Sequence, residues 1–301
     1  MKPIIQKFDD LPDQQEPIFG KWLRPGEVVM LFGDAGSQKT YISLCIAYAI
    51  STGQEFLGMQ AKRRTVLYID GEMGDDLTRR LLNLESSDMF ESGLTDNFYS
   101  ISPKDCPGEV IYNIATYEGQ RALDKLINDS KADVIFIDNL TVCAQNTSDL
   151  RNDFDKWDMI QPWLIRHKNA GKTIILLHHT NKGGRDQSGG KAKEVIINYN
   201  IRIAKSRLVP ALGKRGIVFE FLKRRESGEV EAPDLLIGAS MYEKDGIKYP
   251  SYEYETLKQA QGREIRKLLD EGYPSAHIAA KLELDKWMVD EIKKTKEMIK
   301  W

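Results

Sequence analysis

One segment constrains this chain more than any other, a predicted strand, glycine-containing loop and helix near its start. The apolar run Val28–Phe32 predicts a buried strand, and Gly33–Thr40 follows it with the sequence GDAGSQKT. The apolar stretch that comes next ends before Gly53, as a buried helix does. Loop N–H groups and a helix N-terminus bind phosphate, Lys39 is placed for the outer phosphates, and Thr40 is placed to ligate Mg²⁺. The segment therefore predicts a binding site for ATP and Mg²⁺.

The loop departs from the usual phosphate-binding pattern at a single position. The glycine expected directly before Lys39 is Gln38. A side chain there must point away from the phosphates, so Gln38 either weakens hydrolysis or is a tolerated variant. The predicted nucleotide-binding residues are Gly33, Asp34, Ala35, Gly36, Ser37, Gln38, Lys39 and Thr40.

Composition bounds the class of protein. The 301 residues, 41% of them hydrophobic, suffice for one large domain with a small appendage. No apolar stretch approaches the roughly 20 residues that span a bilayer, and the first residues lack the apolar core of a signal peptide. We therefore expect a cytoplasmic protein without a membrane partner. A net charge of −2 confines any nucleic-acid contact to local patches, and the three cysteines fit reduced packing residues rather than a disulfide or zinc pattern.

Apolar strands and helices alternate along the next 150 residues. The predicted strands are Arg64–Asp70, Phe98–Ile101, Ala132–Asp138 and Lys172–Leu177, and the predicted helices include Tyr117–Ser130 and Asn152–Ala170. Uniformly apolar strands that alternate with helices predict an α/β fold, a mostly parallel sheet covered by helices on both faces. Ligands of such sheets bind at the carboxyl ends of the strands.

Polar residues stand at those carboxyl ends. Asp138 suits Mg²⁺ binding, and Glu72 is the candidate for orienting the attacking water, with a helix cap as its alternative role. His178 and His179 are adjacent on a strand and point to opposite faces, so they do not chelate one metal ion. We expect His179 to hydrogen-bond the γ-phosphate, the alternative being a histidine with no catalytic task.

The C-terminal third has a different character. Strands are predicted at Val195–Ala204 and Gly216–Leu222, and Lys244–Glu255 reads as a linker or an edge strand. Three short helices are predicted last, at Leu257–Leu269, Ser275–Leu282 and Asp285–Ile299. Their outline is that of a helix-turn-helix, and a small bundle that packs on the core or on a neighbouring subunit is the alternative. The predicted divisions are a lead-in at 1–25, an ATPase domain at 26–255 and a helical domain at 256–301.

Taken together, these motifs resemble a known group. The order GDAGSQKT, LYIDGEM, VIFIDNL, a Trp-containing helix and IILLHHTNKGG is similar to RecA-like P-loop (Walker A) ATPases of the hexameric plasmid replicative helicase type (RepA), and more distantly to DnaB-type helicases. The resemblance covers residues 18–230. It implies a RecA-like fold in which Lys39 and Thr40 bind the phosphates and Mg²⁺, Glu72 is the catalytic glutamate, Asp138 is the second-motif acid and His179 is the sensor.

The same resemblance implies a ring and a DNA substrate. In the family, a Lys-x-Arg pair on a late strand reaches the site of the neighbouring subunit, and Lys223 and Arg225 fit that pattern. A hexameric ring with single-stranded DNA in its channel is implied, and a replication initiator or a primase is a further candidate partner. The candidate DNA contacts are Lys182, Arg185, Lys191 and Lys193. This chain lacks the separate N-terminal domain of DnaB-type helicases, which argues against their mode of primase docking.

The sequence thus predicts an ATP-driven DNA helicase of a phage or plasmid replication module. Two alternatives stand beside it. One is a recombination or repair ATPase of the RecA/RadA kind, and the other is a nucleotide-dependent DNA-binding or regulatory protein that hydrolyses little ATP because of Gln38.

Overall fold

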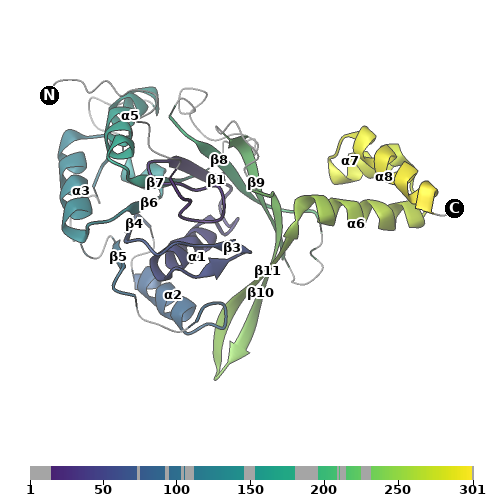
Figure 1. Ribbon diagram of the computed structural model, residues 1–301, viewed down its shortest axis with the longest axis horizontal. Helices are drawn as coiled ribbons and strands as arrows, with labels where there is room; N and C mark the ends of the chain where they lie inside the picture. Colours follow the sequence, from purple (N-terminus) through teal and green to yellow (C-terminus); the bar gives the residue numbers. More distant parts are fainter. Residues whose placement is uncertain are drawn as a thin grey trace.

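The computed structural model describes residues 15–72, 75–91, 95–102, 105, 112–145, 153–179, 196–208, 210, 215–224 and 232–299. Its centre is a nine-stranded sheet in the order β11-β10-β9-β8-β1-β7-β6-β4-β5. Helices lie against this sheet, and the last three helices of the chain stand out to one side (Figure 1).

The central part of the sheet is parallel and its far part is antiparallel. The parallel strands are β1 (Val28–Gly33), β4 (Val66–Asp70), β5 (Phe98–Ile101), β6 (Val134–Asp138), β7 (Thr173–His179) and β8 (Tyr199–Lys205). The antiparallel extension adds β9 (Arg215–Arg224), β10 (Leu235–Lys244) and β11 (Ile247–Thr256). Register sets Gly33 beside His179 and Asp70 beside Asp138, so the carboxyl ends of these strands meet at one edge.

Helices cover both faces of the sheet, which confirms the predicted architecture. The hydrophobic core on one face contains α1 (Lys39–Thr52) and α2 (Asp75–Glu85). The core on the other face contains α3 (Tyr117–Ser130), α4 (Leu140–Cys143) and α5 (Asp153–Asn169). Helix α1 is apolar around most of its circumference because it is buried on nearly every side, and it ends at Gly53, whose φ of 77° needs no Cβ.

Residues ahead of the first strand belong to this core. Ile18, Phe19, Trp22 and Leu23 are all buried, and the Trp22 ring lies edge-on to Tyr199 and to Phe221 at centroid distances of 5.1 and 5.2 Å. A two-stranded hairpin, β2 (Glu55–Phe56) with β3 (Met59–Gln60), lies next to them through the bridge from Phe19 to Ala61.

The antiparallel extension differs from the sequence-based expectation in one element. Strand β10 is not among the predicted strands, because only its first half is buried and its second half is polar and exposed. Pairing with β9 on one side and β11 on the other forms it. The Lys244–Glu255 stretch is an edge strand, β11, rather than a linker, and β8 begins at Tyr199 rather than at Val195.

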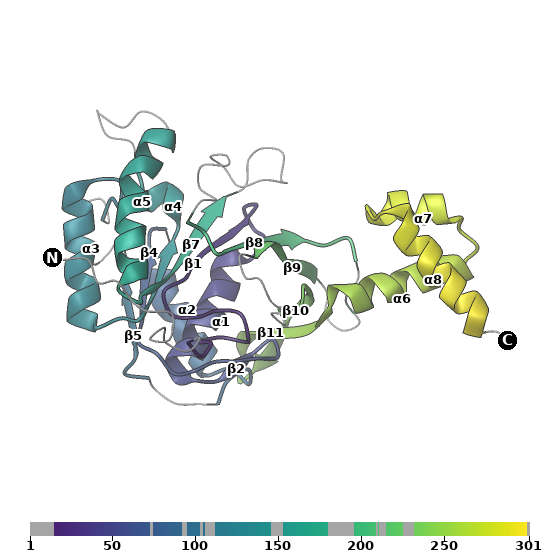
Figure 2. The ribbon, with the colours of Figure 1, turned by 45° about the horizontal axis from the view of Figure 1, so that its top comes forward.

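The last helices are α6 (Leu257–Asp270), α7 (Ser275–Leu282) and α8 (Lys286–Ile299). Thr256 and Gln259 form a capping box that starts α6, and Ala260 packs with Val218 and Leu236 of the sheet. The helices also share a small core of their own around Ile265, Leu268, Ile278 and Val289, beyond the end of the sheet (Figure 2). Within the part of the chain that the structure describes, no helix is both long and apolar enough to cross a membrane.

Candidate active site

The phosphate loop (Gly33–Thr40) joins β1 to α1 with two residues in the left-handed region. Gly36 has a φ of 72° and Gln38 a φ of 68°. A Cβ on Gly33 would overlap the carbonyl oxygen of Ile203 on the adjacent β8, so only glycine fits there. Lys39 Nζ donates to the carbonyl oxygens of Gly33 and Asp34 at 2.7 and 2.8 Å, which places the cation at the mouth of the loop.

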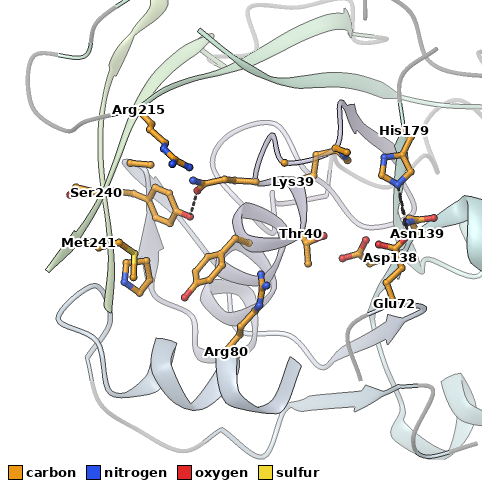
Figure 3. A pocket seen from close by; sticks show the side chains of 17 residues that line it. Lys39, Thr40, Glu72, Arg80, Asp138, Asn139, His179, Arg215, Ser240 and Met241 are labelled. Atoms are coloured by element: carbon orange, nitrogen blue, oxygen red, sulfur yellow. Dashed lines mark hydrogen bonds and ion pairs between the residues drawn. The ribbon is translucent and has the colours of Figure 1, made fainter. Parts of the chain in front are cut away.

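Gln38 accepts a hydrogen bond from another part of the sheet. Tyr252 Oη, on β11, donates to Gln38 Oε1 at 2.8 Å (Figure 3). A left-handed conformation costs a residue with a Cβ about 1 to 2 kcal/mol, so this contact helps to hold a backbone shape that glycine adopts freely. The backbone geometry expected of glycine is therefore present despite the glutamine.

Asp138 is buried at the end of β6 and lies against Thr40. The Tyr68 hydroxyl donates to Asp138 Oδ2 at 2.8 Å, and the Tyr68 oxygen is 2.9 Å from Ser43 Oγ. Burial raises the pKa of Asp138 to about 6, although hydrogen bonds from Tyr68 and Thr40 oppose that rise. A hydroxyl and a carboxylate are oxygen ligands that Mg²⁺ prefers, so Thr40 and Asp138 fit the expected metal.

Glu72, Asn139 and His179 form a polar cluster beside that acid. Asn139 Nδ2 donates to Glu72 Oε1 at 2.6 Å and lies 3.3 Å from His179 Nε2, while the Glu72 and His179 atoms are 3.9 Å apart. Asn139 is buried, whereas the side chains of Glu72 and His179 are half-exposed toward the cavity (Figure 3). His178, one residue earlier, is buried, so the two histidines do face different surroundings.

These groups share one cavity of about 770 Å³ with an acidic end and an aromatic end. The phosphate loop, Glu72, Asp138, Asn139 and His179 line one part, and Arg215 also lines the cavity (Figure 3). The remaining lining residues are Tyr41, Arg80, Ala239, Ser240, Met241, Pro250 and Tyr252. The Arg80 guanidinium sits 5.4 Å from the centre of the Tyr41 ring. The cavity therefore offers cations and loop N–H groups for phosphates and flat apolar surface for a nucleoside.

Several of these residues were not predicted from the sequence. Asn139 could have been predicted, because it directly follows Asp138, a predicted metal ligand at a strand end. No sequence motif marks Tyr252 as a site residue. A second cavity, of about 420 Å³, shares Gly36, Gln38 and Arg215 with the first and is also lined by Lys205 and Arg207. Lys205-Ser206-Arg207 repeats the Lys-x-Arg spacing of the predicted pair, so the sequence did contain a signal for it.

Lys223 of the predicted Lys-x-Arg pair is not brought to this site within one subunit. Strand β9 runs antiparallel to β8, so Lys223 pairs with Asn200 near the start of β8. The phosphate loop follows the end of β1, which is parallel to β8, and therefore lies at the opposite end of the strands. Arg225 lies outside the described residues, as do the predicted DNA contacts Lys182, Arg185, Lys191 and Lys193. Their roles stay predictions.

Comparison with known proteins agrees with this geometry. Residues 3–185 match the family model described as AAA domain, which is more than half of the chain. The chain belongs to the AAA domain family. No curated protein matches the sequence.

Solved structures with a similar fold include two archaeal proteins. One is a KaiC-like protein of Pyrococcus horikoshii, with a TM-score of 0.50 and 14% identity over 75% of this chain and 90% of that one. The other is the flagellar accessory protein FlaH of Methanocaldococcus jannaschii, with a TM-score of 0.51 and 13% identity over 76% and 90% of the two chains. At this identity the likeness concerns the fold, and it confirms the RecA-like α/β class for this AAA domain. Together, family and fold make the chain a RecA-like P-loop ATPase.

Proposed function

We propose that this protein hydrolyses ATP in the cavity and uses the energy to move along single-stranded DNA as a ring-forming helicase. The observation that carries the ATPase part is the meeting of Thr40 and Asp138 with the Glu72, Asn139 and His179 cluster at the mouth of the phosphate loop. Phosphoryl transfer to water needs a metal site, a cation and a group that positions the nucleophile, and these residues provide all three together with Lys39.

Each side chain has a distinct task in this proposal. Loop N–H groups and Lys39 bind the outer phosphates. Thr40 and Asp138 would hold Mg²⁺, which would supply positive charge to neutralise the phosphates. Glu72 accepts a hydrogen bond from the attacking water, and Asn139 fixes the carboxylate through the 2.6 Å bond to Oε1. His179 shares the Asn139 amide and lies at the end of β7, just before the segment that carries Lys182 and Arg185.

The DNA and ring parts rest on the resemblance to replicative helicases. Residues 180–198 link β7 to β8, and the predicted DNA contacts lie within this link. A phosphate sensor at the start of such a link couples nucleotide state to DNA contact, which is what a translocase requires. Recombination ATPases of the RecA/RadA kind share the fold, so unwinding is the activity that separates the two proposals.

The test measures ATP turnover with and without single-stranded DNA, followed by unwinding of a forked duplex. We expect turnover that single-stranded DNA stimulates and strand separation that depends on ATP. Lys39→Ala serves as the control and is expected to lose nucleotide binding, because a cation for the phosphates is gone. Stimulated turnover without unwinding would favour a recombination ATPase, and nucleotide binding with negligible turnover would favour the regulatory alternative.

A further inference from the structure

Gln38 occupies the one position at which the phosphate loop lacks its usual glycine, and it contacts a residue 214 positions away. Its partner Tyr252 lies on β11 opposite Ala239 of β10. The Tyr252 ring packs against Tyr41 and Phe56, with centroids 6.2 and 6.0 Å away. A hydroxyl on a ring held in this way has a fixed position, so it anchors Gln38.

Glycine and glutamine reach the positive φ at position 38 in different ways. Glycine takes a positive φ without strain and leaves the loop free to leave that shape. Gln38 has the same positive φ with a side chain tied to β11. Because Ser37 and Lys39 are the direct neighbours of Gln38, its bond to Tyr252 restrains the N–H groups of the loop that would face the phosphates.

We propose that Gln38 is a positioning residue, which through the Tyr252 hydroxyl makes the phosphate-binding shape of the loop depend on the β10–β11 hairpin. The proposal rests on the proposed function insofar as the cavity must bind a nucleotide. It assigns the hairpin a task besides lining the cavity with Ser240, Met241 and Pro250. Movement of the hairpin changes phosphate affinity without contact between hairpin and phosphate.

The test is a double-mutant cycle of Tyr252→Phe with Gln38→Gly, read out as binding of a fluorescent ATP analogue and of inorganic tripolyphosphate in the presence of Mg²⁺. Tyr252→Phe keeps the ring and removes the hydroxyl. With Gln38 present, we expect it to weaken both ligands by about 3- to 10-fold, the scale of one net hydrogen bond. With glycine at position 38, the same change is expected to alter binding by less than about 2-fold, because the bond is already gone.

A second variant tests the same idea without touching the hairpin. Gln38→Ala keeps the Cβ that disfavours a positive φ and loses the anchor, so we expect it to bind tripolyphosphate more weakly than the unchanged protein. Gln38→Gly is expected to bind tripolyphosphate more tightly than Gln38→Ala, because glycine adopts the conformation freely.

Three outcomes would overturn the proposal. Equal effects of Tyr252→Phe in both backgrounds would show that the hydroxyl acts by another route. Loss of affinity for the ATP analogue but not for tripolyphosphate would show that the Tyr252 hydroxyl acts on the nucleoside and not through the phosphate loop. A lower melting temperature of the nucleotide-free protein with unchanged tripolyphosphate binding would make the bond merely structural. Retained binding in Lys39→Ala would instead refute the cavity as the nucleotide site and so the proposed function.

Discussion

The carboxylate of Asp138 suits Mg²⁺ binding, but burying its charge destabilises the fold. Its carboxyl is buried at 4% exposure, and burial raises the pKa from 3.8 to about 6. An acid with a raised pKa favours the folded protein in its protonated form, so that contribution is present below about pH 4 and is lost as pH rises toward 6. At neutral pH the ionised carboxylate therefore destabilises the nucleotide-free protein by about 3 kcal/mol.

We predict that Asp138→Asn stabilises the nucleotide-free protein and abolishes Mg²⁺-dependent nucleotide binding. The gain in unfolding free energy over the unchanged protein should grow from pH 4 to pH 7 and reach about 1 to 3 kcal/mol, since the amide has no charge to bury. Urea unfolding at several pH values measures it. A gain that does not change with pH would show that the carboxylate is not the cause.

The side-chain amide of Asn139 lies between Glu72 and His179. We predict that Asn139→Ala lowers kcat by about 10-fold or more with little change in KM, because it removes a group that orients the glutamate and not one that binds phosphate. Steady-state ATPase assays measure kcat and KM separately. Asn139→Asp is the matched variant, in which a second carboxylate repels Glu72, and it should be no better than alanine. A raised KM with normal kcat would place Asn139 in substrate binding instead.

At the scale of elements, one carboxylate on helix α3 makes several hydrogen bonds to helix α5. Asp124 of α3 accepts hydrogen bonds of 2.8 Å from Trp163, Arg166 and His167 of α5. Burial tends to raise the pKa of Asp124, but these three bonds outweigh it and hold the pKa below its usual value. Burial lowers the pKa of His167, so the ring is a neutral donor to Asp124 near neutral pH.

We predict that Asp124→Ala lowers the free energy of unfolding by about 2 to 3 kcal/mol at pH 7, the scale for hydrogen bonds to a charged group. A depressed carboxyl pKa stabilises the fold above the usual pKa, and that stability is lost as pH falls through the folded value, so the difference should shrink in acid. Urea unfolding measures it. Lys125→Ala is the control on the same helix, since its pair with Asp129 is exposed and should matter by less than about 0.5 kcal/mol. Similar losses in both variants would contradict the stabilising role of these hydrogen bonds.

At the scale of the whole molecule, two arginines are candidates for the proposed contact with the site of a neighbouring subunit. The sequence-based prediction names Arg225, while Arg207 follows β8 at the same edge of the sheet as the phosphate loop. Arg207 also pairs with Glu283 of the C-terminal helical unit at 2.9 Å. Both side chains are largely exposed, so that pair adds little stability and leaves Arg207 available to a partner subunit.

We predict that mixing separates the two. Glu72→Gln protein is combined with Arg207→Ala protein or with Arg225→Ala protein. Glu72→Gln and the variant that lacks the arginine acting across the interface are each expected to be inactive alone, for the arginine by a factor on the scale of about 10³, while the other arginine variant stays active. An arginine that acts across an interface gives partial recovery of ATPase, because some sites then combine an intact glutamate with an intact arginine. We expect recovery with one of the two. Recovery with neither, or full activity of both arginine variants alone, would refute a shared site.

Much of the site could be predicted because its signals are local. The phosphate loop lies between an apolar strand and an apolar helix. Asp138 and His179 are the last residues of β6 and β7, and Glu72 stands two residues after the end of β4. The expected helix at Tyr117–Ser130 matches α3 because its apolar positions recur at helical spacing and Thr116 caps it. Such signals are complete within about 20 residues of chain.

By itself, then, the sequence determined which residues enter the central parallel strands and which main helices separate them, and hence the parallel sheet with its ligand edge. Tertiary structure alone decided what lies next to that edge. Pairing with two neighbours made β10 a strand, the return of β11 brought Tyr252 to Gln38, and antiparallel pairing carried Lys223 to the opposite edge from the phosphate loop. These contacts join residues far apart in the chain, and only the order and register of the sheet fix which of them meet.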